Sequence, residues 1–242
     1  MKNLKMFAVA ALAAMSMSAT AQVTYGYDQE YTPTRAAIYG ADNESFGLFY
    51  AQFNPSKIHS KATSGSASET ESESVNAVTL GYNYYISLSE DLPLYIAPGI
   101  AAQWFFKNTK EHGEEDKFNM ISAKIPVNVM YSIQVSDGFR IEPYAGVYGR
   151  VNIWGEEKYT DEDGTEKANI FDKDEMGDLA FKRFQLGWNA GVNFRITNAF
   201  TIGVGYYMDL LKVQELDGEL YGYKYSAKSN FQGFDITLGV NF

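Results

Sequence analysis

Apolar and polar or small residues alternate through residues 184–196, which read FQLGWNAGVNFRI. Phe, Leu, Trp, Ala, Val, Phe and Ile occupy every second position, and Gln, Gly, Asn, Gly, Asn and Arg lie between them. Successive side chains of a strand point to opposite sides, whereas a helix repeats about every 3.6 residues. The segment therefore predicts a β-strand with one apolar face and one polar face.

Seven other segments alternate in the same way and predict further strands. They cover residues 46–53, 75–87, 94–106, 118–135, 140–153, 200–210 and 233–242. The turns LSEDLP, VSDG and TNA join three neighbouring pairs, and long polar stretches make the other connections. Short turns at one end and long loops at the other are typical of outer-membrane barrels. We expect an all-β fold: a closed antiparallel up-and-down transmembrane barrel of eight strands, with short periplasmic turns and long extracellular loops.

Three prolines lie inside these predicted strands. Proline has no backbone N–H, so each one removes a hydrogen bond from a strand ladder. Pro143 lies near the start of a strand, where the loss is tolerated. Pro98 and Pro126 lie further inside and predict bulges or locally broken pairing.

The same alternation fits two opposite environments. In a soluble barrel or sandwich the apolar face packs inward, whereas in a membrane barrel it contacts lipid and the polar face lines the interior. A soluble surface is rich in Lys and Glu, but the polar face here consists mainly of Gly, Asn, Gln and Tyr. Small residues suit the crowded interior of a narrow barrel. We therefore expect the apolar face to contact lipid, with the soluble barrel as the alternative.

The first residues predict export. Lys2 and Lys5 precede a short apolar run at residues 6–15, and Ala19-Thr20-Ala21 forms a small-residue cleavage site. We expect a signal peptide at residues 1–21, a periplasmic lead-in at 22–43 and an outer-membrane barrel domain at 44–242. The apolar run is shorter than the ~20 residues of a spanning helix.

Composition excludes several kinds of partner and site. The formal net charge is −10, which argues against nucleic acid because the phosphate backbone requires a basic surface. Cysteine is absent, so disulfides and thiolate metal sites are excluded. We expect no cofactor and no metal.

Four segments resemble those of a known family: FNMISAKIPVNVMYSI, FRIEPYAGVYGRV, FQLGWNAGVNFRI and FTIGVGYYMDLL. They are similar to the eight-stranded outer-membrane barrel domains often labelled porin-like, including the OmpA- and OmpX-like barrels. The last strand also resembles the signal by which the barrel assembly machinery recognises its clients. The residues that carry this second resemblance are Phe234, Ile236, Leu238, Val240 and Phe242. The resemblance implies the barrel assembly machinery and outer-membrane lipid as partners.

Charged residues on the polar face form the main candidate site. They are Lys124, Glu142, Arg150, Arg183, Arg195, Asp209 and Asp235. Isolated charges are costly to bury, so charges inside a narrow barrel need partners. Glu142 and Arg195 are predicted near the periplasmic end of neighbouring strands, and Arg183 and Asp209 near the outer end. We expect internal salt bridges that plug the lumen; the alternative is a small ion-conducting pore.

Two weaker patterns point to a metal site and to catalysis. Asp161, Asp163 and Gly164 resemble part of a calcium loop, but an EF-hand needs acids where Tyr159 and Ile170 stand, so an acidic hairpin tip is favoured. The two histidines, His59 and His112, are in predicted loops without a nucleophile or metal motif. Ser60 follows His59, but neighbouring strand residues face opposite ways. We therefore expect no enzymatic activity.

These observations predict an outer-membrane barrel with a structural or surface-interaction role. The long acidic loops and the Ser-rich first loop are the expected contact surface for an extracellular ligand. A small passive porin is the alternative, and a lipid-modifying enzyme is a more distant one.

Overall fold

The computed structural model describes residues 44–64, 67–89, 92–111, 114–161, 164–197, 199–220 and 223–242. These residues belong to one compact unit, Ala36–Phe242. The predicted signal peptide, 1–21, and the predicted lead-in, 22–43, lie outside the described residues. Within the described part of the chain, no helix has the length and hydropathy needed to cross a membrane.

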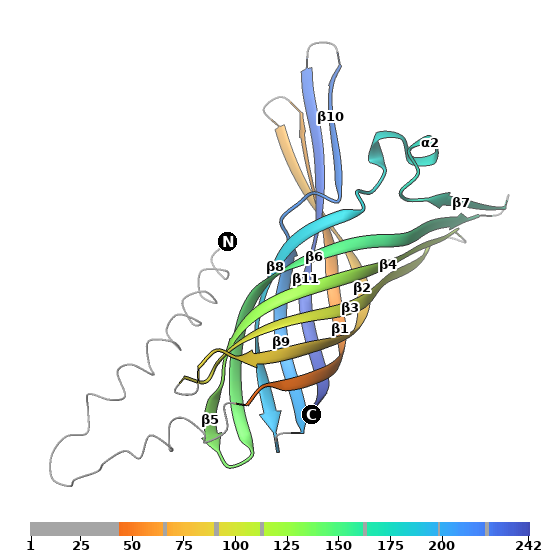
Figure 1. Cartoon of the computed structure of the whole chain (residues 1–242). Coiled ribbons are helices and arrows are strands. Elements are labelled where there is room, and N and C mark those ends of the chain that lie inside the picture. Colours follow the sequence, from red (N-terminus) through yellow and green to blue (C-terminus); the bar gives the residue numbers. More distant parts are fainter. Residues whose placement is uncertain are drawn as a thin grey trace, which may run out of the picture. The chain divides into compact units, whose positions relative to one another are not determined.

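Antiparallel strands make up most of the described residues (Figure 1). The strands are β1 (Phe46–Ser64), β2 (Ala67–Ser87), β3 (Leu94–Glu111), β4 (Glu114–Tyr131), β5 (Ile133–Ser136), β6 (Phe139–Thr160), β7 (Thr165–Asn169), β8 (Phe184–Ile196), β9 (Phe200–Asp209), β10 (Gln214–Leu220) and β11 (Tyr223–Asn241). A short helix, α2 (Lys173–Met176), and a 3-10 turn, η2 (Gly177–Leu179), lie between β7 and β8. The predicted all-β antiparallel class is confirmed.

The strand pairings form a ring. The order is β1-β2-β3-β4-β6-β8-β9-β11, and β11 pairs again with β1. β5 and β7 pair with β6, and β10 pairs with β11. Gly47 and Phe242 exchange two backbone hydrogen bonds at 2.8 and 3.0 Å, so pairing continues beyond the last β1–β11 register pair. Consecutive ring strands therefore lie side by side, and the last returns to the first.

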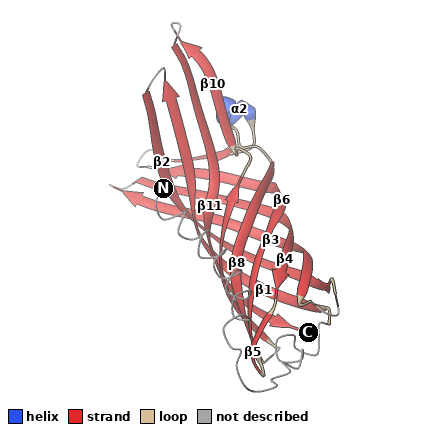
Figure 2. Ribbon diagram, turned by 90° about the vertical axis from the view of Figure 1, so that its left-hand side faces the viewer, coloured by secondary structure: helices blue, strands red, loops and turns tan. Residues whose placement is uncertain are grey.

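The predicted strands have the right positions, but several extend beyond the predicted bounds. β8 matches its predicted range, Phe184–Ile196. β1 and β2 instead pair from Phe46–Tyr85 to Ser64–Ala67, through the stretch predicted as a Ser-rich loop. That prediction of a loop was wrong, because Ser, Thr and Glu on both faces conceal a two-residue period. Figure 2 shows β2, β10 and β11 extending past the body of the ring.

Pro98 and Pro126 interrupt the pairing of β3 with its neighbours, but the register is the same on both sides of each gap. The β2–β3 register passes from Asn83–Gly99 to Ile86–Ile96, and the β3–β4 register from Pro98–Val127 to Ala101–Lys124. The register shift between β4 and β6 instead lies at Ile121/Ser122, away from the prolines. This bulge leaves Ile153 and Trp154 both exposed and reverses the facing of the rest of β6.

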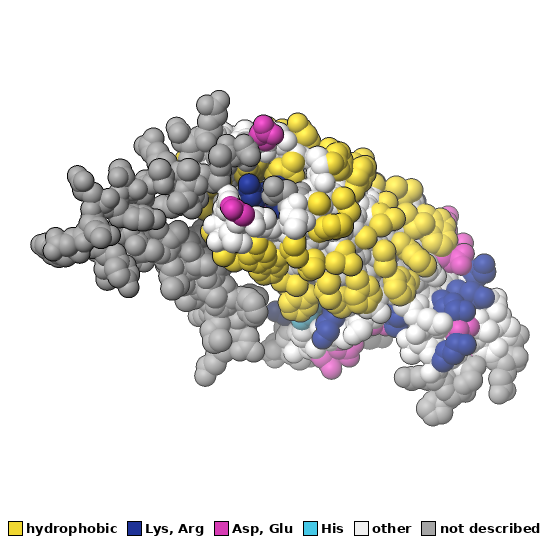
Figure 3. Space-filling view, turned by 90° about the horizontal axis from the view of Figure 1, so that it is seen from below, with side chains coloured by type: hydrophobic (Ala, Val, Ile, Leu, Met, Phe, Trp, Pro, Cys, Tyr) yellow, Lys and Arg dark blue, Asp and Glu magenta, His cyan; other side chains and the backbone are white. Residues whose placement is uncertain are grey.

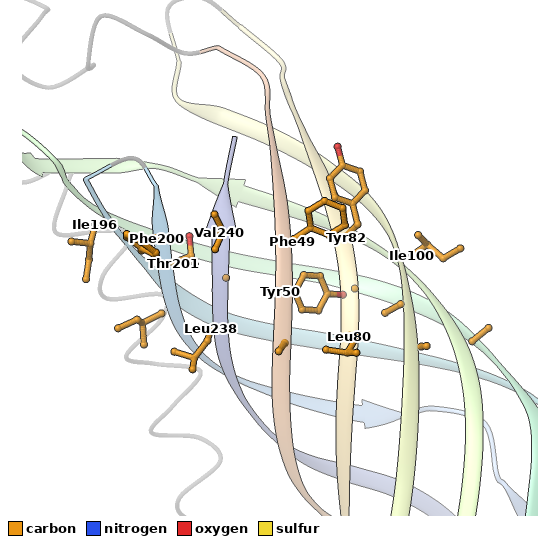
Figure 4. A pocket seen from close by; sticks show the side chains of 17 residues that line it. Phe49, Tyr50, Leu80, Tyr82, Ile100, Ile196, Phe200, Thr201, Leu238 and Val240 are labelled. Carbon is orange, nitrogen blue, oxygen red and sulfur yellow. The ribbon is translucent and has the colours of Figure 1, made fainter.

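Apolar side chains cover the outside of the ring and polar ones fill the inside. Leu80 and Leu238 are 62% and 61% exposed, whereas Asn54 and Arg150 are 0% exposed. Figure 4 shows apolar side chains from β1, β2, β3, β9 and β11 on neighbouring strands, and Figure 3 shows an extensive hydrophobic surface. A soluble fold has the opposite arrangement, so the apolar face requires an apolar environment.

Gly187 allows close packing inside the ring. A Cβ there would lie 2.2 Å from Tyr148 Cζ and 2.7 Å from the Met208 carbonyl oxygen. At Gly149, on a neighbouring strand, the nearest atom would be Phe184 Cε2 at 4.0 Å. The Tyr148 ring and the Met208 carbonyl group therefore already fill the space into which a side chain at position 187 would point.

We expect Gly187→Ala to lower the free energy of unfolding by about 1–3 kcal/mol, because it overpacks a filled interior. Gly149→Ala is the matched control and should change it by less than about 0.5 kcal/mol. Urea unfolding of both variants in the same detergent measures the difference. Equal stability of the two variants would contradict the close packing described here.

Candidate functional site

The end of the lumen nearest the strand extensions holds a buried ion pair. Arg150 on β6 contacts Asp209 at the end of β9, and both side chains are fully buried. Tyr148 Oη donates a hydrogen bond of 2.6 Å to the same carboxylate. The guanidinium lies 5.0 Å from the ring of Phe105 and 5.1 Å from that of Phe231. Two aromatic rings therefore lie beside a buried charge pair that links β6 to β9 across the intervening β8.

An apolar cluster surrounds this pair and continues into the connections between strands. Besides Phe105, Tyr148 and Phe231, its buried members include Val75, Ala77, Phe118, Met120, Ile170, Phe181, Tyr207 and Val213. Ile170 and Phe181 flank α2 and η2, and the Phe181 N–H donates to the Ile170 carbonyl oxygen at 2.7 Å. The sequence analysis missed Ile170 and Phe181 because both lie outside the alternating segments. With the rest of the cluster, they place apolar side chains at the end of the lumen nearest the strand extensions.

The middle of the lumen is polar. Asn54 Nδ2 donates a hydrogen bond of 2.6 Å to Asp235 Oδ1, and Thr79 Oγ1 donates to Asn54 Oδ1 at 2.7 Å. Lys124 Nζ lies 4.1 Å above the centre of the Tyr148 ring. A cavity of about 30 Å³ lies beside Lys124 and Asp235. One water needs roughly 10–15 Å³ by this measure, so the cavity has room for about two.

A second buried ion pair lies toward the other end of the ring. Arg195 on β8 contacts Glu142 on the neighbouring strand β6. Ser132 Oγ donates a hydrogen bond of 3.0 Å to the same carboxylate. The Arg195 guanidinium lies 4.0 Å above the ring of Phe46, which stacks on Tyr85 at a centroid distance of 4.5 Å. Charge and aromatic surface thus occupy this end of the lumen together.

The structure places the predicted lumen charges in two groups. Buried are Lys124, Glu142, Arg150, Arg195, Asp209 and Asp235. Arg183 is exposed, so its predicted place in the lumen was wrong. It precedes β8, and its Nη1 donates to the carbonyl oxygens of Asn152 and Ile153 at 3.2 and 2.8 Å. Arg150, not Arg183, is the partner of Asp209.

Carboxylates gather beyond the apolar cluster, on the inner faces of the strand extensions. Lys107 Nζ contacts Glu73 and lies 3.3 Å from Asp116 Oδ2. Burial lowers the pKa of Lys107, but the contacts with Glu73 and Asp116 outweigh burial and raise it above its usual value. Burial raises the pKa of Glu157, and the charges of Asp116 and Glu73 raise it further. The inner faces therefore carry clustered negative charge.

Of the residues weighed for calcium and for catalysis, Asp161, Gly164, His59 and Ser60 are among the described residues. Thr160 pairs with Thr165, and Gly164 N donates to Asp161 Oδ1 at 3.0 Å, while Asp163 and His112 lie outside the described residues. His59 is on β1, not in a loop as predicted, and its Nδ1 lies 3.0 Å from Ser72 Oγ. No cluster of three or more metal-ligating side chains occurs among the described residues.

Comparison with known proteins gives a family match. Residues 46–214 match a family described as outer membrane protein beta-barrel domain. No curated protein matches the chain. These residues span most of the ring.

Several solved structures show a distant likeness. OprG of Pseudomonas aeruginosa is 11% identical with a TM-score of 0.36, covering 85% of this chain and 99% of that chain. Ail of Yersinia pestis, solved with the heparin analogue sucrose octasulfate, is 12% identical with a TM-score of 0.34, covering 78% and 98%. Neisserial surface protein A is 16% identical with a TM-score of 0.32, covering 78% and 96%.

We expect Asp209→Ala to lower the free energy of unfolding by about 3–5 kcal/mol, because it leaves the Arg150 charge buried and uncompensated. Asp217→Ala is the control: its exposed carboxylate lies 3.7 Å from Lys228 Nζ, and its loss should cost less than about 1 kcal/mol. Urea unfolding in detergent measures both. The double variant Arg150→Met/Asp209→Leu should be more stable than Asp209→Ala alone, and a double variant as unstable as the single would contradict this explanation.

Proposed function

We propose a structural or surface-interaction role for this chain, which belongs to the outer membrane protein beta-barrel domain family and lies in the outer membrane. In this proposal the ring of strands is a closed, eight-stranded barrel that crosses the bilayer. The ends of the ring where β2 meets β3, β5 meets β6 and β8 meets β9 face the periplasm, and the long hairpins face outward. The exposed apolar face supports this placement, because each strand edge in hydrocarbon must be paired and each outer side chain apolar.

The buried side chains on the inner face of the ring support the proposed function. Two buried ion pairs, a polar middle layer and an apolar outer cluster occupy successive levels, and only about 30 Å³ remains in the polar middle cavity. An eight-stranded barrel has an interior just wide enough for side chains to fill. We infer that internal salt bridges and their aromatic neighbours plug the lumen, and that the protein conducts no ions.

The strand extensions are the part of the barrel offered to partners. β1–β2, β3–β4, β6–β7 and β10–β11 form hairpins that continue past the buried clusters. Their inner faces carry Glu73, Asp116 and Glu157. We propose these acidic hairpins as the contact surface for an extracellular ligand, with no enzymatic role for His59.

The last strand remains the proposed signal for the barrel assembly machinery. Phe234, Ile236, Leu238, Val240 and Phe242 are all exposed on the outer face of the ring. The Phe242 ring stacks near that of Phe49 at a centroid distance of 5.4 Å. An apolar strand face that is accessible before the ring closes supports recognition during assembly.

We expect the mature protein to fractionate with the outer membrane and to migrate faster on a gel when it is not heated, because a closed barrel stays compact in detergent. Gel electrophoresis of heated and unheated samples, together with membrane fractionation, tests this expectation. A mature polypeptide that is soluble and monomeric without detergent would contradict the membrane placement.

We expect no steady conductance from the purified protein in planar bilayers, because side chains fill each level of the lumen. Insertion is verified separately by the gel shift of protein recovered from the same lipid. A conducting porin reconstituted in parallel is the positive control. Steady single-channel currents from verified, inserted protein would favour the passive porin and remove the plug.

A further inference from the structure

Three lysines form a row across the outer faces of neighbouring strands. Lys117 on β4 is directly opposite Lys158 on β6, which is directly opposite Lys167 on β7. In the same register, Ile121 pairs with Trp154 four residues along, and both are exposed on the apolar surface. The lysines therefore share the outer, apolar face of the ring. They lie beyond its last apolar row.

Like charges directly opposite each other destabilise a sheet. Neighbouring carboxylates balance only part of this row: Glu115 Oε2 lies 2.9 Å from Lys117 Nζ, and Glu156 Oε1 lies 3.6 Å from Lys167 Nζ. Glu115 is shared with Lys110 at 3.1 Å. No carboxylate of the described residues lies within 4 Å of Lys158 Nζ. The row keeps an excess of positive charge.

The inner faces of the same hairpins carry the opposite charge. Asp116 on β4 and Glu157 on β6 alternate with Lys117 and Lys158 along their strands. The bulge near Ile153 directs Glu157 inward and Lys158 outward. In a chain with a formal net charge of −10, the strand period has therefore placed cations on the outer face.

A second set of lysines follows the same rule on β1 and β11. Lys61 is directly opposite Lys228, and Lys57 lies four residues beyond the exposed Phe53 on the same face of β1. Figure 3 shows a broad hydrophobic surface, with Lys and Arg side chains at its edge and Asp and Glu side chains beside them. The arrangement is therefore not confined to one hairpin.

The position of the row matches the depth of lipid phosphates. Four residues span about 13 Å of strand, or about 10 Å of height for a strand tilted by about 40°. Lysine stems lie along apolar surface while their ammonium groups reach polar surroundings. An ammonium group at this level is within reach of lipid headgroups, because the same surface continues down into the hydrocarbon.

We propose that Lys117, Lys158 and Lys167 bind the phosphate of an anionic lipid in the outer leaflet. This inference rests on the proposed placement of the ring across the bilayer. Lipid is the occupant because the row is continuous with the lipid-facing apolar surface, whereas the mouth, which dissolved anions would approach, is acidic. A phosphomonoester fits three ammonium groups better than a zwitterionic headgroup does.

Spin-labelled lipids test the proposal on the full mature protein reconstituted in phosphatidylcholine vesicles. We expect the lipid shell to prefer labelled phosphatidic acid over labelled phosphatidylcholine by about tenfold at low salt, falling toward onefold at about 1 M salt. Lys117→Gln/Lys158→Gln/Lys167→Gln should lose most of this preference. The arginine triple variant should retain it, because charge and not lysine itself is required.

The matched control is Lys173→Gln/Lys182→Gln/Lys212→Gln, which removes the same charge from the connections before β8 and β10. It should keep the wild-type preference. Equal preference in the row variant and in this control would overturn the proposed site. Absence of a motionally restricted signal with either lipid would instead overturn the membrane placement, so the two failures are distinguishable.

Discussion

The antiparallel pairing of β1 with β11 is the interaction on which the rest of the structure depends. It runs from Leu48–Asn241 to Ser64–Tyr225 in one register. A free strand edge in hydrocarbon would leave N–H and C=O groups without partners, at several kcal/mol for each group. Once this edge is paired, each strand of the ring has two neighbours, and every second side chain must point into a narrow interior. Closure therefore determines both what contacts lipid and what must be packed inside.

The narrow interior explains the unusual partners of its charges. Arg150 and Asp209 are too deeply buried to be solvated by bulk water, so each depends on the other and on Tyr148, Phe105 and Phe231. The Tyr148 ring fits beside this ion pair because the residue that faces it on β8, Gly187, has no side chain. Five tyrosines of the described residues are thus buried as interior rings with a polar tip: Tyr50, Tyr85, Tyr95, Tyr148 and Tyr207.

Much of the fold, but less of the site, could be predicted from the sequence. Alternation identified β8 and the other ring strands because a lipid face and a lumen face differ in polarity. It failed in the hairpin of β1 and β2, where both faces are polar and the period has no hydrophobic contrast. Arg183 was misplaced because it precedes β8, where its guanidinium donates to the carbonyl oxygens of Asn152 and Ile153. Ile170 and Phe181 could not be found by any strand period, since they enter the lumen from a connection.

The hairpins extend the same constraint beyond the membrane. Within the ring, the two-residue period separates apolar from polar side chains; past the last apolar row it separates Lys158 from Glu157. Because pairing is unbroken from Ile121–Trp154 to Lys117–Lys158, the outer face at both levels is one surface. The outer face therefore holds Lys158 above the apolar rows, whereas the inner face holds Glu157 over the buried side chains of the ring. If side chains plug the lumen as we propose, these two faces of the hairpins are where the described barrel meets its surroundings.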